Sequence, residues 1–180
     1  METTNMYLYK AIDAYPYDLQ EAVEALNYAL SYEPNNAHAL FLMGRLYAEQ
    51  LQEVETAIDY YEAALASEIN LIKAYPHYLD ALIKNEMLDE AQKFLDFAMT
   101  VNAADKPLLI YFKGITLEKK GELKAAIKTY KCAKKLALNG DFVRFANAQI
   151  ERVKGKMPKK KKSKKKKKKS NKNKKKGDKK

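Results

Sequence analysis

Residues 54–70, VETAIDYYEAALASEIN, contain a pattern that occurs four times along the chain. An apolar residue is followed three positions later by alanine, four positions after that by a large apolar or aromatic residue, and three positions further on by a second alanine. The other copies are LQEAVEALNYALSYEPNN from Leu19, LDEAQKFLDFAMTVNAAD from Leu88 and LKAAIKTYKCAKKLALNG from Leu123. The first alanines of the copies, spaced 35, 34 and 35 residues apart, are Ala22, Ala57, Ala91 and Ala126. Four copies at one period indicate a repeat protein.

A second helical pattern precedes the repeated segments. ALFLMGRLYAEQ, residues 39–50, and LIYFKGITLEKKG, residues 109–121, each place a glycine between large apolar residues. Small residues let two helices approach closely, and the large residues beside them fill the remaining space. Gly121 and Asn85 stand between the helices of a pair, where we expect a left-handed backbone conformation. The sequence therefore predicts an all-α stack of helix pairs.

Residues 3–138 resemble the tetratricopeptide repeat (TPR) family, whose 34-residue motif is a helix pair with a Leu-Gly, aromatic, Ala, aromatic, Ala, Pro skeleton. The resemblance implies a right-handed helical-repeat solenoid of about four pairs. The second and fourth units carry the motif most completely, whereas the opening helix of the first lacks the glycine. The four units are expected at about residues 3–36, 37–71, 72–106 and 107–139.

The third unit departs from the pattern because Pro76 lies inside its opening segment and Tyr78 or Leu79 stands where glycine belongs. Proline is tolerated only in the first turn of a helix. We therefore predict that this helix begins near Tyr75.

The segment after the fourth unit, GDFVRFANAQIERVKGKMP, predicts a ninth helix over residues 140–156 with Asp141 as its N-cap. A solenoid needs such a helix to cover the apolar face of its last repeat, although a docking helix for a partner is the alternative. The apolar stripe of the ninth helix consists of Phe142, Phe145, Ala146, Gln149, Ile150 and Val153.

The single cysteine, Cys132, cannot form an internal disulfide, and we expect it to pack as a small apolar residue.

The sequence contains no pattern that is typical of a catalytic or metal site. The two histidines, His38 and His77, have no neighbouring ligands at metal-binding spacing. There is also no glycine-rich phosphate loop and no nucleophile with an adjacent base. We expect no enzyme activity, no cofactor and no metal. The absence of a long apolar run or a signal peptide predicts a chain without a membrane span and with a cytoplasmic location, or a nuclear one if the source is eukaryotic.

The TPR resemblance implies a partner site on the concave surface, which the first helix of each pair lines. Aromatic residues recur there, and both exposure in the groove and packing between helices remain open for them. TPR domains that clamp chaperone tails use basic and amide side chains, of which only Lys73 is present here. We therefore expect a different protein or peptide partner. The predicted groove residues are Tyr7, His38, Phe41, Arg45, Lys73, Tyr75, Asp80, Tyr111, Ile115 and Glu118.

Residues 159–180, KKKKSKKKKKKSNKNKKKGDKK, hold sixteen lysines and one acidic residue. This tail carries +15 of charge, and because the whole chain carries +11, the remainder is close to −4. Such a run cannot bury apolar surface, so residues 157–180 are expected to be a disordered tail. The densest candidates for polyanion binding are Lys159, Lys160, Lys161, Lys162, Lys164, Lys165, Lys166, Lys167, Lys168 and Lys169.

Three roles are open for the tail: binding of RNA or DNA phosphates, contact with an anionic membrane, and nuclear import or solubility. It contains no arginine or aromatic residue for reading bases, so any nucleic-acid contact should be unspecific. The favoured interpretation of the chain is a non-enzymatic adaptor whose repeats bind a protein or peptide. The alternative is a nucleic-acid-associated or ribosome-associated accessory protein in which the tail is the primary binding element.

Overall fold

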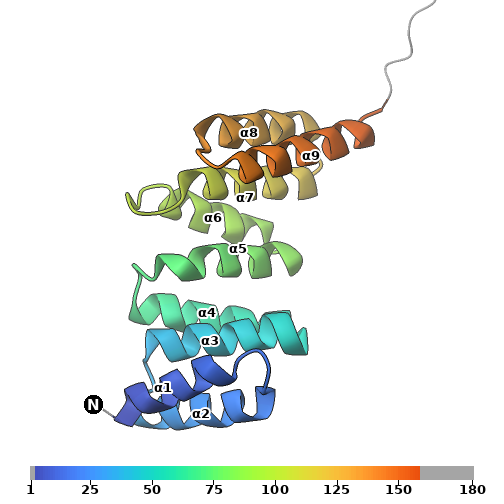
Figure 1. The fold of residues 1–180 in the computed structure, drawn as a ribbon. Helices are drawn as coiled ribbons and strands as arrows, with labels where there is room; N and C mark the ends of the chain where they lie inside the picture. The colour runs from blue at the N-terminus through green and yellow to red at the C-terminus, as the bar shows by residue number, and fades with distance from the viewer. Residues whose placement is uncertain (1–2, 159–180) are drawn as a thin grey trace, which may run out of the picture.

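The computed structural model describes residues 3–158, with side chains from residue 6 onward. This part of the chain is an all-α solenoid of four stacked helix pairs followed by a ninth α-helix, with no strand (Figure 1). The predicted fold class is confirmed. The helices are α1 Thr3–Ala14, α2 Leu19–Tyr32, α3 Ala37–Leu46, α4 Val54–Ser67, α5 Tyr75–Lys84, α6 Leu88–Ala98, α7 Lys106–Lys119, α8 Leu123–Leu136 and α9 Gly140–Lys156.

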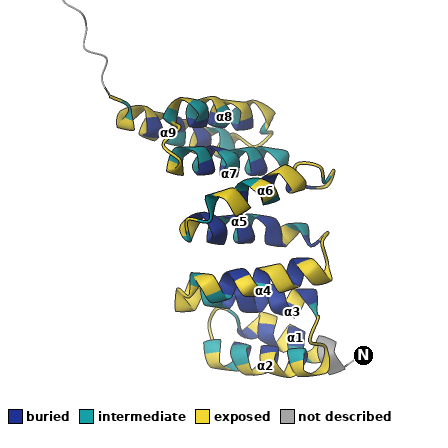
Figure 2. Ribbon diagram, turned by 180° about the vertical axis from the view of Figure 1, so that it is seen from behind, coloured by how far each residue is buried: buried dark blue, intermediate teal, exposed yellow. Residues whose placement is uncertain are grey.

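The repeated alanines lie at the contacts between helices. Figure 2 shows buried residues on the helix faces that are turned toward neighbouring helices. All the alanines of the repeat are fully buried, because only a methyl group fits between two backbones at this distance. They are Ala22, Ala29, Ala57, Ala64, Ala91, Ala98, Ala126 and Ala133.

Two glycines make room for buried tyrosine rings. A Cβ atom added at Gly44 would lie 2.7 Å from the ring of Tyr61, and one added at Gly114 would lie 2.4 Å from the ring of Tyr130. The first and third units have Leu26 and Leu95 at the position of these tyrosines, and their opening helices lack the glycine. The glycine of the motif therefore occurs in the units that have a tyrosine at the facing position and is absent from those that have a leucine there.

The left-handed residue between the helices was predicted correctly in one unit and wrongly in another. Gly121 has φ +81°, as predicted, but Asn85 has φ −81° and the left-handed residue is Glu86, with φ 60°. The amide of Met87 donates to the carbonyl of Leu82 (2.9 Å), which closes the helix end one residue later than expected.

The start of α5 agrees with the effect of proline on a helix. A short 3-10 turn, Ile72–Ala74, precedes α5, which begins at Tyr75 with Pro76 in its first turn. The predicted start near Tyr75 is confirmed. A π-helical turn, Tyr47–Leu51, follows α3 and ends at Gln52, whose φ is 60°.

Helix α9 packs against α8 and buries Ala146, Ile150 and Val153. Its N-cap is Asn139 rather than Asp141, because the Asn139 side chain accepts from the Asp141 amide (2.8 Å) and the helix begins at Gly140. No helix in the described range is long and apolar enough to cross a membrane. The tail from Lys159 lies outside the described residues.

The expectation that Cys132 packs as a small apolar residue is wrong. The buried stripe of α8 consists of Ala126, Tyr130 and Ala133. Cys132 precedes Ala133 by one residue, which is about 100° around the helix, and its side chain is exposed.

Candidate functional site

An open hollow of about 660 Å³ lies on the side of the solenoid formed by the first helices of the first two pairs. Its walls come from α1, the turn after α1, α3 and the segment that leads into α5. Two of its apolar residues are well exposed, Tyr9 at 61% and Ile12 at 49%. The lining residues are Leu8, Tyr9, Ile12, Tyr15, Pro16, His38, Phe41, Leu42, Arg45 and Lys73.

Glu49 joins side chains from three units beside this hollow. Arg45 donates two hydrogen bonds to its carboxylate, both of 2.9 Å, and the hydroxyl of Tyr15 donates a third. His77 Nδ1 of α5 lies 3.4 Å from Glu49 Oε1. Arg45 also lies over the ring of Tyr15, with its Cζ atom 4.9 Å from the ring centroid. These contacts hold one wall of the hollow in place.

The environment of this network shifts the pKa values of its members. Burial alone would raise the pKa of Glu49, but the hydrogen bonds from Arg45 and Tyr15 lower it below its usual value. Burial lowers the pKa of His77, and the positive charge of Arg45 adds to this effect. Arg45 is therefore held by an ionised partner, which makes it a part of the wall rather than a free cation.

Lys73 is the cation that the hollow offers to a ligand. Its Nζ atom lies 5.4 Å from the centroid of the Phe41 ring, and no ion pair joins it to a carboxylate of residues 3–158. His38, which also lines the hollow, has its Nε2 atom 4.0 Å from Glu68 Oε2. An apolar wall thus stands beside a lysine without a carboxylate partner.

Four of the ten predicted groove residues, His38, Phe41, Arg45 and Lys73, line the hollow, and the other six do not. Tyr7 stacks on Tyr28 and Tyr32 of α2, with ring centroids 5.2 Å and 6.0 Å apart. Tyr75 is only 1% exposed and its hydroxyl donates to the carbonyl of Ile69 (2.7 Å). Both tyrosines pack between helices, which is the alternative that the sequence left open.

The remaining predicted residue of the third unit, Asp80, lies apart from the hollow. It forms an ion pair of 2.7 Å with Lys84, four residues later on α5. With Glu49, Tyr61 and His77 it borders a cavity of only about 40 Å³. This cavity is too small for a peptide side chain of any length.

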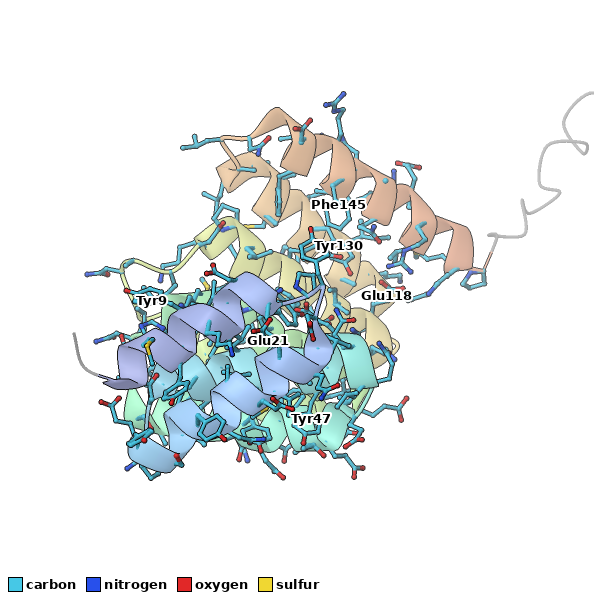
Figure 3. All side chains as sticks on the ribbon, turned by 60° about the horizontal axis from the view of Figure 1, so that its bottom comes forward. Tyr9, Glu21, Tyr47, Glu118, Tyr130 and Phe145 are labelled. Carbon is cyan, nitrogen blue, oxygen red and sulfur yellow. The ribbon has the colours of Figure 1, made fainter. Side chains whose placement is uncertain are left out.

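Helix α9 covers the predicted groove in the fourth unit. The Glu118 side chain is only 8% exposed and accepts two hydrogen bonds of 2.6 Å from Arg152 and one of 2.7 Å from Lys156. Tyr111 packs on Phe145, with ring centroids 5.0 Å apart, and Ile115 is partly buried in the same cluster. Figure 3 shows Glu118, Tyr130 and Phe145 where α7, α8 and α9 meet.

This cover has a strong electrostatic component. Burial alone would raise the pKa of Glu118, but the hydrogen bonds from Arg152 and Lys156 lower it to about 2. Tyr130 also donates to this carboxylate (3.2 Å). Glu118 is therefore occupied by contacts within the chain, whereas the predicted groove residues that line the hollow come from the second unit and, with Lys73, from the start of the third.

The sequence interpretation missed the contribution of α1 to the hollow. Met6, Tyr9 and Ile12 follow one another at intervals of three residues, and all three side chains are exposed. This spacing indicates an apolar helix face that no other part of the described chain covers. Helix α1 lacks the glycine that marks the register in the second and fourth units, so the motif points to Tyr7 and not to Tyr9.

Comparison with solved structures identifies proteins of the same architecture. Two structures of MamA, a double mutant from RS-1 and residues 41 to the end from Desulfovibrio magneticus RS-1, each have a TM-score of 0.67. They are 16% and 18% identical to this chain, both comparisons cover 86% of it, and they cover 90% and 89% of the MamA chains. PilW, a widely conserved type IV pilus biogenesis factor, has a TM-score of 0.68 at 19% identity, over 85% of this chain and 71% of its own.

These neighbours are TPR-like helical repeat proteins. The chain has a TPR-type fold. No model of a known protein family matches the sequence, and neither does any curated protein sequence. At this level of identity the comparison establishes the architecture, and the function has to be argued from the hollow and the charged surfaces.

The acidic and histidine side chains of residues 3–158 are the remaining candidates for a metal site. No group of three or more His, Cys, Asp or Glu side chains in this range is placed to hold a metal ion. The acidic network at Glu49 and the one at Glu118 are both satisfied by arginine.

Proposed function

We propose that this protein is a non-enzymatic adaptor that holds a segment of a protein partner in the hollow between α1 and α3. The observation that carries the proposal is the exposure of Tyr9 and Ile12 in a hollow of about 660 Å³. Exposed apolar side chains in a concave site are typical of surfaces that bind other proteins or peptides. The TPR-type fold supports this, because a solenoid presents an extended surface of this kind.

The chemistry of the lining suggests the chemistry of the partner. Tyr9, Ile12 and Phe41 favour apolar side chains, and Lys73 favours a carboxylate next to them. We infer a segment with one or two large apolar residues followed by an acidic residue or a free C-terminus. The hollow is lined by residues of the first two units and by Lys73 at the start of the third, so the segment is short.

The test compares two matched variants of residues 1–158. A chain of residues 1–158 contains all the buried apolar clusters of the structure, so it should fold, and it lacks the lysine-rich tail. Ile12→Asp places a charge in the hollow, and Leu51→Asp places the same charge on the π-helical turn at an equally exposed apolar residue (46% against 49%). A protein that is retained by the parent and by Leu51→Asp, but lost with Ile12→Asp, is the expected result. Equal retention by both variants contradicts the proposal.

A second candidate function is a nucleic-acid-associated or ribosome-associated accessory protein in which the tail, Lys159 to Lys180, is the main binding element. It is supported by the sixteen lysines of the tail. In the adaptor interpretation the same tail tethers the complex to a polyanion. If the body without residues 159–180 retains no partner, and binding by the full chain falls steeply with salt, the accessory role is the better one. We place either activity in the cytoplasm, with the nucleus as the alternative location.

A further inference from the structure

The exposed face of α8 is a stripe of lysines. Lys124, Lys128, Lys131 and Lys135 follow one another at intervals of four, three and four residues, which places them on one side of the helix. All four are exposed. Helix α8 contains no acidic residue, and no ion pair joins any of the four to a carboxylate of residues 3–158.

The same positions carry the opposite charge in another repeat. When the repeats are aligned on their buried alanines, Lys124, Lys128 and Lys131 correspond to Glu55, Asp59 and Glu62 of α4, which are also exposed. In α6 the corresponding residues are Asp89, Lys93 and Asp96. The fold therefore does not require a particular charge at these positions, and the lysines of α8 need another explanation.

The stripe does not stabilise the helix that carries it. Lysines three and four residues apart repel each other, and Lys124 lies in the first turn, where the helix dipole disfavours a positive charge. Only Lys135, with Lys134 beside it in the last turn, has a favourable position. A polyanion placed along the stripe would relieve this repulsion.

The stripe also lies next to the origin of the lysine tail. Lys156, near the end of α9, donates to Glu118 near the end of α7 (2.7 Å), and α8 begins four residues after α7 ends. Figure 1 shows the last turn of α9 at this end of the stack. The sequence then continues with sixteen lysines in its last 22 residues. The described part of the chain therefore ends near the first turn of α8.

The dimensions of the stripe suit one strand of a nucleic acid. Lys135 comes eleven positions after Lys124 in the helix, so at a rise of about 1.5 Å per residue the stripe is about 16 Å long. A strand of B-form DNA presents a phosphate about every 3.4 Å along its axis, so about five phosphates would face the four lysines. The stripe contains no arginine or aromatic side chain that could read bases.

We propose that the lysine stripe of α8 is a folded binding site for the phosphodiester backbone of RNA or DNA, without sequence preference. This goes beyond the adaptor function, since it uses a different surface from the hollow. In this proposal part of the nucleic-acid binding lies in the folded body, whereas the interpretation of the sequence placed such binding in the tail alone.

The test measures binding of the full chain to a fluorescently labelled single-stranded RNA by anisotropy over a series of salt concentrations. The stripe variant is Lys124→Gln, Lys128→Gln and Lys131→Gln. The control variant, Lys10→Gln, Lys84→Gln and Lys93→Gln, removes the same charge from exposed lysines on other helices. Each lost phosphate contact to a single strand lowers the slope of log K against log salt by about 0.7, so the stripe variant should lower it by about 2.

The control variant should keep the slope of the parent, and a variant with arginine at the three stripe positions should restore it. Equal slopes and affinities for the stripe and control variants would overturn the proposal, because the tail would then account for all the binding. The proposal is also wrong if the stripe variant loses binding to vesicles of anionic phospholipid but not to RNA. Ile12→Asp should leave RNA binding unchanged, which separates this test from that of the hollow.

Discussion

Replacement of Gly114 by alanine should destabilise the protein although alanine is the better helix former. The added Cβ atom would lie 2.4 Å from Cε1 and 2.6 Å from Cδ1 of Tyr130, whereas carbon atoms in contact are normally about 3.5 to 4.0 Å apart. The helices or the ring would have to move by about 1 Å. Tyr130 is fully buried, packs on Tyr111 and donates to Glu118, so its ring has no free space to enter.

The magnitude follows from two opposing effects. Overpacking of a core costs about 1 to 3 kcal/mol of unfolding free energy, and a rigid, fully buried ring places this site near the upper value. Alanine in a helix interior returns about 0.5 to 1 kcal/mol. We expect a net loss of about 2 kcal/mol for Gly114→Ala.

The matched control is Gly155→Ala in α9, where an added Cβ atom would meet no other heavy atom within 4 Å. It should stabilise the protein by about 0.5 kcal/mol, because only the helix preference changes. Urea unfolding followed by circular dichroism measures both variants. A Gly114→Ala variant as stable as the parent would refute the reasoning. The destabilisation should disappear when Tyr130→Leu is the background, since leucine occupies this position in the units without the glycine.

Three further predictions concern other parts of the body. The pKa of Glu118 is about 2 in the folded protein and 4.5 for an ordinary glutamate in the unfolded chain, so the stability that its ionised form contributes is complete above about pH 4.5 and is lost as the pH falls toward 2. In Glu118→Gln this acid-induced loss of stability, measured by thermal unfolding at each pH, should be smaller. Glu86→Gly should raise the unfolding free energy by about 0.5 to 1 kcal/mol, because Glu86 has a φ of 60° and glycine adopts this conformation without steric cost. An unfolding free energy in urea that is equal to or lower than that of the parent would contradict this prediction. Cys132 should react with a thiol reagent in the native protein as fast as in urea, since it is exposed, and strong protection in the native state would show that it is covered.

The period of the sequence predicted the buried framework well. The spacing of alanines identified residues such as Ala57 and Ala126 that the structure buries completely, because the contact between paired helices repeats with the chain. The start of α5 was predictable from Pro76 alone, since proline limits where a helix can begin. Local rules and the repeat therefore account for most of the architecture.

Most of the correctly predicted residues of the candidate site come from the second unit, where the motif is complete, and Lys73 of the third unit is the exception. Phe41 and Arg45 belong to a unit with the glycine, and both line the hollow. The role of Glu118 was not predictable from its own repeat, because its partners, Arg152 and Lys156, come from a helix outside the repeats. Their spacing of four residues on the predicted ninth helix was the available signal, since it places two cations on one face.

The reversal of charge between α4 and α8 makes the folded body an electric dipole. Glu55, Asp59 and Glu62 give α4 an acidic exposed face, and the lysines of α8 give the opposite sign two pairs further along the stack. In the field of a polyanion such a body rotates until α8 faces the charge and α4 is turned away. The hollow between α1 and α3 would then point toward solvent, so the molecule could be anchored by one end while a partner enters at the other.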